Sequence, residues 1–405
     1  METSKSNLRG LPRNLWVVTA TSFLTDISSE MIFNLIPLFL ANVLKAGTAA
    51  IGLIDGLAET TASLTKMYSG ALSDRLGTRK WITVVGYGLS ACAKPFLYFA
   101  DAWGWVLAVR VSDRLGKGIR TAPRDALVAD SIDEERRGLA FGLHRAGDTA
   151  GAFIGVLAAA AIVWMTERNA VDLTRRTFQI AVLVSILPAI LAVLILAFGA
   201  QDTGIRSKSK VPILSMKGMD RRFKLFMLAL ALFSLGNSSD AFIILLGQNR
   251  GLTVLQVMLM MMSFNLVYTI LAGPLGAASD KIGRRKLILY GWIAYGLVYL
   301  GFAASKTGWH VWILFGLYGI YYAATEGSTK AFIADLVAPE QRGKAYGISN
   351  AVIGLMAFPA SVIAGLLWQG AFAWSGFGHP APFLFGAGMA ILAGILFWKM
   401  APAQR

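Results

Sequence analysis

The chain contains one cysteine, Cys92, and three histidines, His144, His310 and His379, among its 405 residues. A single cysteine cannot form an intrachain disulfide, and the histidines lack the spacing of metal ligands. The sequence therefore predicts neither a disulfide scaffold nor a metal site, and it gives no sign of a cofactor. A nucleophile paired with a base and a phosphate-binding loop are also missing, so an enzyme is the least favoured class.

Charged residues are scarce as well. They make up 15% of the chain, against 56% hydrophobic residues and a mean hydropathy of +0.58, whereas soluble proteins carry about 25% charged residues. A membrane-spanning helix needs roughly 20 apolar residues, so a chain of this length has room for about twelve spans and no large soluble domain. The lipid bilayer is the predicted environment.

Apolar runs predict twelve helices in two groups of six. The first six are expected at 14–44, 49–73, 81–100, 103–128, 139–164 and 177–199. The second six are expected at 224–246, 254–277, 286–304, 310–334, 346–371 and 381–399. We predict an all-α membrane protein with an N-terminal bundle at 1–200, a polar cytoplasmic linker at 201–223 and a C-terminal bundle at 224–405. The first helix has no small-residue cleavage site, so we expect it to be retained.

Lysine and arginine predict the orientation of these helices. If both termini are cytoplasmic, the inner segments contain 23 of these residues, with the helix-end residues Lys224, Lys286 and Lys399 included, and the outer loops contain 6. Cytoplasmic loops are enriched in basic residues, so we expect both termini in the cytoplasm and a multi-pass protein in the inner or plasma membrane. The net charge of +15 comes from these scattered loops, and we therefore expect no nucleic-acid partner. We expect a monomer.

The two groups of helices repeat one another. Residues Gly70, Asp74, Arg75, Gly77, Arg79 and Lys80 recur 206 positions later as Gly276, Asp280, Lys281, Gly283, Arg285 and Lys286. Residues Ala129, Asp130, Arg137 and Gly138 recur at an offset of 205 as Ala334, Asp335, Arg342 and Gly343. Six helices separate equivalent positions, so the repeats run in the same direction and are related by an axis along the membrane normal.

With these repeats the chain resembles the major facilitator superfamily over essentially its whole length. The segment 70–80 and its copy at 276–286 resemble motif A of that family, which forms an inner latch. The resemblance implies that Asp74 approaches a helix N terminus of the other half and that Arg79 pairs with Asp130. The implied gating residues are Gly70, Asp74, Arg75, Gly77, Arg79, Lys80, Asp130, Gly276, Asp280, Gly283, Arg285 and Asp335.

Two further motifs are partly present. Arg114 and Gly118 resemble motif B. Gly142, Gly151 and Gly155 resemble motif C, which the family associates with antiporters. Close helix packing explains these glycines equally well.

Seventeen ionisable residues fall within the predicted helices. At about 3 kcal/mol each in contact with lipid they would cost roughly 50 kcal/mol, so they are expected to face one another or water. The acids are Asp26, Glu30, Asp55, Glu59, Asp113, Asp148, Asp240 and Glu326. The bases are Lys66, Lys94, Arg110, Arg114, Lys117, Arg120, Arg124, Arg145 and Lys330.

The spacing of these residues selects candidates for a transport site. Asp26 and Glu30 share one face of the first helix. With Glu59 they are the predicted proton carriers. The competing interpretation is permanent pairing, of Asp26 or Glu30 with Arg114 and of Glu59 with Lys66. The candidate substrate-cavity residues are Arg114, Lys117, Arg110, Asp113, Lys66, Asn237, Asp240, Asn265, Tyr268, Tyr318, Tyr322 and Glu326.

These residues predict a secondary transporter that moves a small solute by alternating access around a midplane site. Proton-coupled efflux by antiport is the first expectation, because of the partial motif C. The alternative is a proton symporter that takes up an anionic solute, because bases are abundant in the fourth and fifth helices. A transport-inactive membrane sensor or scaffold is a third reading.

Overall fold

A computed structural model describes residues 10–133, 136–204, 215–371 and 373–400. The side chains of Asp280 and Glu340 and half of the basic residues of the predicted linker (Arg206, Lys208 and Lys210) lie outside this description. The first-half helices are α1 (Arg13–Phe33), α2 (Ile36–Leu38), η1 (Phe39–Val43), α3 (Thr48–Leu76), α4 (Arg79–Ala93), η2 (Lys94–Phe99), α5 (Trp103–Asp130), α6 (Arg137–Glu167) and α7 (Arg175–Gly199). The second-half helices are α8 (Arg221–Gly236), α9 (Ala241–Asn249), α10 (Val254–Ile282), α11 (Arg284–Ala304), α12 (Gly308–Asp335), η4 (Pro339–Gln341), α13 (Arg342–Gln369) and α14 (Ala381–Lys399).

These elements form twelve spans, as predicted, although three spans are broken. The first consists of α1, α2 and the π-helix η1, and the third changes from α-helix to 3-10 helix at Lys94, before Pro95. The seventh span, predicted as one helix, is split into α8 and α9 by residues 237–240. This break contains Asn237, Ser238 and Ser239, whose short polar side chains compete with the helical hydrogen bonds of the backbone.

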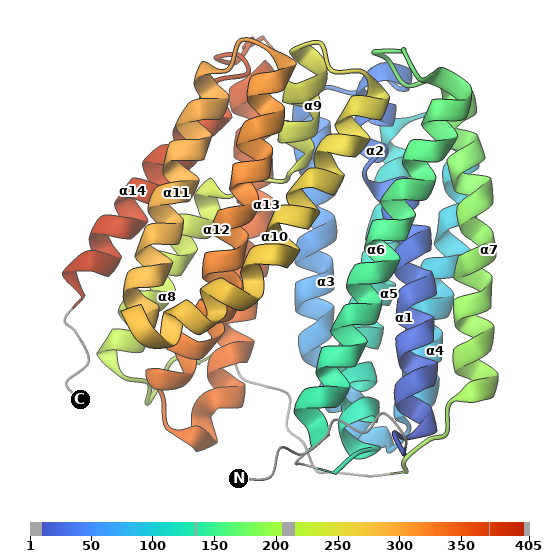
Figure 1. The fold of residues 1–405 in the computed structure, drawn as a ribbon, viewed down its shortest axis with the longest axis vertical. Helices are drawn as coiled ribbons and strands as arrows, with labels where there is room; N and C mark the ends of the chain where they lie inside the picture. Colours follow the sequence, from blue (N-terminus) through green and yellow to red (C-terminus); the bar gives the residue numbers. More distant parts are fainter. Residues whose placement is uncertain (1–9, 134–135, 205–214, 372, 401–405) are drawn as a thin grey trace.

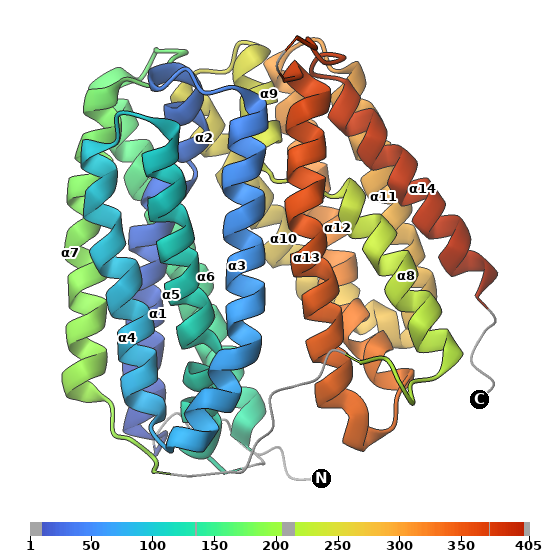
Figure 2. The same ribbon diagram turned by 180° about the vertical axis from the view of Figure 1, so that it is seen from behind.

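The packing of the helices has a pseudo-twofold pattern. In the first half, α1 packs on α6 and α7, α5 packs on α3 and α4, and α4 packs on α7. The corresponding pairs in the second half are α8 with α13 and α14, α12 with α10 and α11, and α11 with α14. Figures 1 and 2 show these two bundles side by side. Between the halves, α3 packs on α13 and α6 packs on α10, which are again equivalent pairs.

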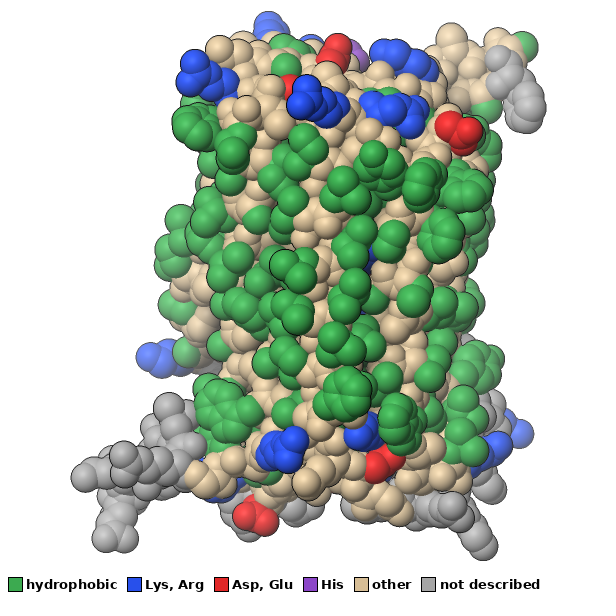
Figure 3. All heavy atoms as spheres, turned by 90° about the vertical axis from the view of Figure 1, so that its right-hand side faces the viewer, with side chains coloured by type: hydrophobic (Ala, Val, Ile, Leu, Met, Phe, Trp, Pro, Cys, Tyr) green, Lys and Arg blue, Asp and Glu red, His purple; other side chains and the backbone are tan. Residues whose placement is uncertain are grey.

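The surface matches a bilayer environment. Figure 3 shows a broad belt of hydrophobic side chains between two bands of charged residues. Helix α7, for example, exposes Leu183, Leu187 and Phe198. In the part of the chain that the structure describes, nine helical segments are long and apolar enough to cross a membrane. Helices α3, α5 and α12 are as long but less apolar, because they carry the charged residues and tyrosines of the interior.

The linker face is the one at which α7 ends and α8 begins, at the bottom of Figure 1, and the upper face is opposite. At the upper face α3 and α13 are in close contact, and the Thr48 hydroxyl donates to the Gly365 carbonyl at 2.8 Å. Figure 2 shows the same two helices apart at the bottom. The halves therefore meet at the upper face and separate toward the linker face.

Candidate transport cavity and gates

An upper cavity of about 480 Å³ lies between the halves. Its lining residues come mainly from α1, α3, α5, the α8–α9 break, α10, α12 and α13. Of the predicted site residues, its lining contains Glu30, Glu59, Arg110, Arg114, Asn237, Asp240, Asn265 and Tyr322. The break in the seventh span is what brings Asn237 and Asp240 to the cavity wall.

Two ion pairs neutralise most of the charge in the upper cavity. Arg110 pairs with Asp55 at 2.9 Å, and Arg114 pairs with Glu59 at 3.1 Å. Both guanidinium groups lie over the ring of Phe33, at 4.3 and 5.0 Å from its centroid. Ser239 of the second half donates to the other oxygen of Asp55 at 2.8 Å. Asp55 therefore joins an arginine of its own half to a serine of the other half.

Glu30 and Asp26 are held differently from Glu59. Glu30 accepts a hydrogen bond from Asn34 at 3.0 Å and forms no ion pair with a described residue. Asp26 lines the lower cavity and has neither a hydrogen bond nor an ion pair within the described ranges. The pairing of Asp26 or Glu30 with Arg114 is therefore not formed. Glu59 is paired, but with Arg114 rather than with Lys66, since Arg114 lies opposite it on α5.

A lower cavity of about 920 Å³ continues toward the linker face. It shares Glu30 and Asn265 with the upper cavity, so these two residues mark the neck between them. The predicted residues Asp26, Lys66, Lys117 and Tyr268 line the lower cavity, together with six further charged residues: Arg120, Arg124, Asp125, Arg145, Asp148 and Lys330.

Glu326 links the halves beside the lower cavity. It accepts hydrogen bonds from Tyr268 and, at 3.3 Å, from Lys330 of its own half. Arg145 of the first half lies 3.8 Å from the same carboxylate and donates to the Tyr268 hydroxyl at 3.5 Å. This group is the only ion-paired connection between the halves that the described residues make near the lower cavity.

Two predicted cavity residues lie elsewhere. Asp113 is 3% exposed and does not contribute to either cavity lining, because the face of α5 that carries it is covered by the first bundle. Tyr318 is fully buried and donates to the Asn237 side chain at 3.0 Å. Its ring packs against Tyr299 in a tilted arrangement and against Tyr322 edge to face. Tyr318 thus supports the lining rather than forming it.

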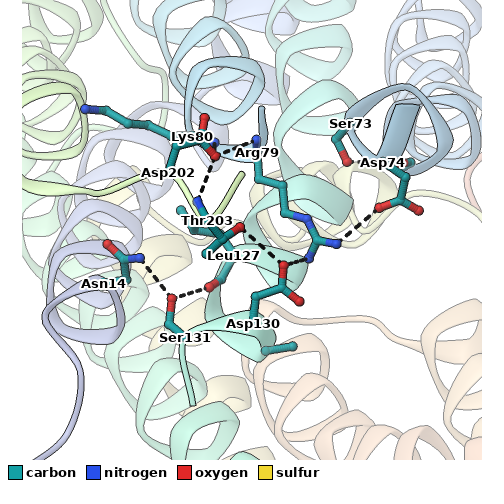
Figure 4. Close-up of polar contacts among 12 residues, drawn as sticks. Asn14, Ser73, Asp74, Arg79, Lys80, Leu127, Asp130, Ser131, Asp202 and Thr203 are labelled. Carbon is teal, nitrogen blue, oxygen red and sulfur yellow. Dashed lines mark hydrogen bonds and ion pairs between the residues drawn. The ribbon is translucent and has the colours of Figure 1, made fainter. Parts of the chain in front are cut away.

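The motif A loop forms a compact polar cluster at the linker face (Figure 4). Arg79 lies between Asp74, at 3.3 Å, and Asp130, with which it pairs as expected. Gly77 ends α3 with a φ of +66°, a conformation that favours glycine. No contact of Asp74 with the second half is present among the described residues, since the halves are apart at this face.

The cluster also contains a residue that sequence reasoning missed. Asp202, which follows α7, accepts from the backbone N–H groups of Arg79 at 3.0 Å and Lys80 at 3.4 Å. It therefore caps the start of α4. An acidic residue shortly after a helix end was the available signal, but its partner is more than 120 positions away in sequence.

The second copy of the motif has a different register. Arg284, not Arg285, pairs with Asp335 at 2.6 Å. Arg285 instead donates to the backbone carbonyls of Phe397 and Trp398. The expected equivalence of Arg285 to Arg79 is therefore wrong. One residue fewer separates α10 from α11 than separates α3 from α4, and the first arginine takes the pairing position.

Arg75 has a partner in the structure. Gly70 approaches Ala122 on α5, while Gly276 has open space beside it.

The upper face is closed by hydrogen bonds between the halves. Asn42 and Gln248 bond to each other through both amide groups, at 3.2 and 2.8 Å. The backbone N–H of Val254 donates to the carbonyl of Ala170 at 3.0 Å. Alongside, the motif C glycines pack α6 on α1, because a Cβ at Gly151 would lie 2.4 Å from the Phe23 carbonyl oxygen. These contacts close the upper face and give part of motif C a packing role.

A multi-pass membrane protein with two repeated six-helix bundles around a charged cavity has the architecture of a secondary transporter. The family model described as Major Facilitator Superfamily matches residues 18–243 and again residues 225–405. The chain belongs to this superfamily, whose members move small-molecule substrates. The fold and the family expected from the sequence are thus confirmed.

Several known proteins are similar to this chain. An uncharacterised MFS-type transporter of Methanocaldococcus jannaschii is 33% identical over 403 residues, which cover 98% of this chain and 97% of that one. The multidrug resistance protein MdtH of Cronobacter sakazakii is 26% identical, covering 98% and 92%. Among solved structures, a variant of the nucleoside transporter NupG has a TM-score of 0.79 at 13% identity, covering 96% and 100%. A bacterial homologue of the human lysosomal transporter Spinster, inward-facing and occupied, has a TM-score of 0.76 at 15% identity, covering 95% of each.

Proposed function

We propose that this transporter exports a small polar solute in exchange for protons. The position of Glu30 carries this proposal. Glu30 lines both cavities at the neck, has an amide rather than a cation as its partner, and is therefore free to change charge as access alternates. Its protonation would change the electrostatic field on both sides of the neck, where a solute must pass.

The orientation follows from the basic residues. Inner segments carry 23 lysines and arginines against 6 in the outer loops, which favours the linker face as the cytoplasmic one in an inner or plasma membrane. In that orientation the structure is inward-facing, with a closed outer gate at Asn42 and Gln248. Efflux is further supported by the similarity to proteins named for multidrug resistance, MdtH and MdtG.

The other candidate residues receive secondary roles. Asp26 lies on the same helix face as Glu30, one turn closer to the linker face, and is proposed to relay the proton to the lower cavity. Glu59 is neutralised by Arg114, so we assign it a structural role first. The polar, charged linings of both cavities favour a hydrophilic solute over a lipophilic one.

For the transport cycle we propose that the bundles 1–200 and 224–405 rock as rigid bodies about the linker 201–223. The motif A cluster of Arg79, Asp74 and Asp130 would meet the second half when the linker face closes. The protein is proposed to act as a monomer, since each chain contains a complete cavity. Helices α3 and α13, whose contacts run from the upper end to the middle of α3, would then open at the upper face and close at the linker face.

A second function has specific support. The lower cavity is lined by six basic side chains, which favours proton-driven uptake of an anionic solute as the alternative. The two functions predict opposite proton movements. In antiport, a solute that enters drives protons out of the same compartment. In symport, the solute carries protons in with it.

The test uses proteoliposomes that enclose a pH-sensitive dye. A panel of cationic, anionic, zwitterionic and neutral solutes is added outside, and the internal pH is followed. Alkalinisation on solute entry supports antiport, and acidification supports symport and overturns the export proposal. Glu30→Gln should abolish the pH change while retaining exchange of labelled solute between the two sides, because only the proton carrier is removed. The matched control is Asp101→Asn, an exposed acid in the α4–α5 loop. If Glu30→Gln still moves protons, the assignment of Glu30 is wrong.

A further inference from the structure

The two cavities carry opposite excess charge. The upper cavity is lined by four acids (Glu30, Asp55, Glu59 and Asp240) and two bases (Arg110 and Arg114). The lower cavity is lined by six bases, Lys66, Lys117, Arg120, Arg124, Arg145 and Lys330, and by four acids. A solute that spans the neck between them therefore meets an acidic region at one end and a basic region at the other.

Of the four acids in the upper cavity, one is available to bind a cationic group. Asp55 and Glu59 are neutralised by Arg110 and Arg114, and Glu30 is assigned to the proton. Asp240 is half-buried at the break between α8 and α9, and its carboxylate has neither a hydrogen bond nor an ion pair within the described ranges. The rings of Phe264 and Tyr322 line the same cavity. An unpaired carboxylate near aromatic rings is a suitable environment for an ammonium group.

Among the six bases of the lower cavity, two lysine ammonium groups have no partner in the described part of the chain. Arg124 pairs with Asp125, and Arg145 and Lys330 share Glu326. Arg120 donates to the hydroxyl of Ser90. Lys66 and Lys117 line this cavity, and neither side chain has an acceptor among the described residues. Two such lysines on neighbouring helices are suited to bind an acidic group.

We propose that the substrate is a bipolar solute, with an ammonium group bound at Asp240 and an acidic group bound at Lys66 and Lys117. This deepens the proposed function and rests on it. The two charged ends are about 10 Å apart along the helices, because seven residues of α5 separate Arg110 from Lys117. Arg110 marks the level of the upper end, since its partner Asp55 accepts from Ser239, the neighbour of Asp240. The middle of the solute then passes Glu30 and Asn265, which places it beside the proposed proton carrier.

The test measures equilibrium binding of glycine peptides to the purified full-length protein, without a pH gradient. Triglycine in extended form spans about 10 Å between its charged ends. N-Acetyltriglycine lacks the ammonium group, triglycinamide lacks the carboxylate, and free glycine is too short to bridge the neck. Triglycine should bind at least about 10-fold more tightly than each of the other three, since each loses one charge-assisted contact. Equal binding of a capped peptide, or no binding of triglycine, would overturn the proposal.

Variants assign the two ends. Asp240→Asn should remove the preference for triglycine over N-acetyltriglycine and leave the preference over triglycinamide. Lys66→Met combined with Lys117→Met should do the opposite. Lys306→Met, an exposed lysine in the loop before α12, is the matched control and should change neither preference. If both variants leave both preferences intact, the assignment of the ends is wrong.

The outcomes separate this inference from the proposed function. If triglycine binds with both preferences but never moves protons, the bipolar site stands and the coupling proposal fails. If singly charged solutes drive proton movement and the bipolar preference is missing, the coupling proposal stands and the bipolar site is rejected.

Discussion

Asn42 on η1 and Gln248 on α9 form a reciprocal amide pair across the two bundles. The Asn42 amide donates to Oε1 of Gln248 at 3.2 Å, and the Gln248 amide donates to Oδ1 of Asn42 at 2.8 Å. Gln248 also donates to the carbonyl of Val171 at 2.7 Å, and the Leu173 N–H donates to Asn42 at 3.0 Å. Because this pair fixes both halves at the upper face, alternating access requires it to break in each cycle.

Cross-linking this pair should therefore stop transport. In a Cys92→Ser background, Asn42→Cys with Gln248→Cys joined by a short, reducible bifunctional thiol reagent should lose more than 90% of solute exchange, roughly the level left by incomplete reaction. A reductant should restore it. The measurement is exchange of labelled solute in proteoliposomes. Asn14→Cys with Ser131→Cys joins two residues of one half, which are hydrogen-bonded at 2.9 Å, and should retain exchange after reaction. Full activity of the cross-linked Asn42 and Gln248 pair would show that the gate need not open.

The contact between α3 and α13 predicts a conformational mutant. A Cβ at Gly52 would lie 2.0 Å from the carbonyl oxygen of Ser361, so Gly52→Ala cannot fit the closed upper face. The variant should favour the state that is open at that face. Ser238→Cys, in the upper cavity, should then react with an impermeant thiol reagent from the upper side about 10-fold faster, which corresponds to a shift of about 1.4 kcal/mol. Gly88→Ala, which meets nothing within 4 Å, is the control. An unchanged rate in Gly52→Ala would contradict the close packing.

The two motif A copies should differ in their contribution to stability. Arg79 is buried between two carboxylates, so Arg79→Ala removes the cation that both share and should cost about 3 kcal/mol. The pair of Arg284 and Asp335 is more exposed, and Arg284→Ala should cost less than about 1 kcal/mol. Thermal unfolding of the detergent-purified variants measures both. Asp130→Asn added to Arg79→Ala should recover part of the loss, and equal losses in the two copies would refute the difference in burial.

Much of this fold could be predicted because hydropathy and duplication are local properties of a sequence. The twelve spans and the repeat direction followed from spacing, and the resemblance to the family's motif A implied the pair of Arg79 with Asp130. The register of the second copy did not follow. One residue, Gly283, separates α10 from α11, whereas two residues separate α3 from α4. This difference shifts the pairing from Arg285 to Arg284. A repeat offset shows which residues are equivalent, but it cannot show how a loop of different length rotates the helix that follows.

The cavity was predictable in composition but not in pairing. The spacing on α1 placed Asp26 and Glu30 on one face, and both line the cavities. Which base pairs with Glu59 depends on the relative rotation of α3 and α5, which no single-helix pattern contains. The same limit explains Asp113, which was expected in the cavity, whereas the burial of its face of α5 was set by tertiary packing. Likewise, Asp240 reaches the cavity because its helix breaks.

One residue outside the spans gives a pH prediction. His379, in the loop between α13 and α14, lies 2.8 Å from the guanidinium of Arg250 through Nε2. Burial lowers the pKa of His379, and the charge of Arg250 lowers this pKa further. Because folding disfavours the protonated ring, the protein has its full stability above the unfolded pKa of about 6.5. It loses stability as the pH falls from there through the pKa of His379 in the folded state.

We therefore expect the thermal stability of the natural chain to fall more steeply between pH 7 and pH 5 than that of His379→Gln, with the two profiles running parallel above pH 7. The measurement is the Tm of both proteins across this range in the same detergent. In an Arg250→Gln background the difference between histidine and glutamine should shrink, because the second cause of the lowered pKa is removed. Identical pH profiles for the natural chain and His379→Gln would mean that the ring gains no penalty on protonation, and that the contact with Arg250 does not persist in solution.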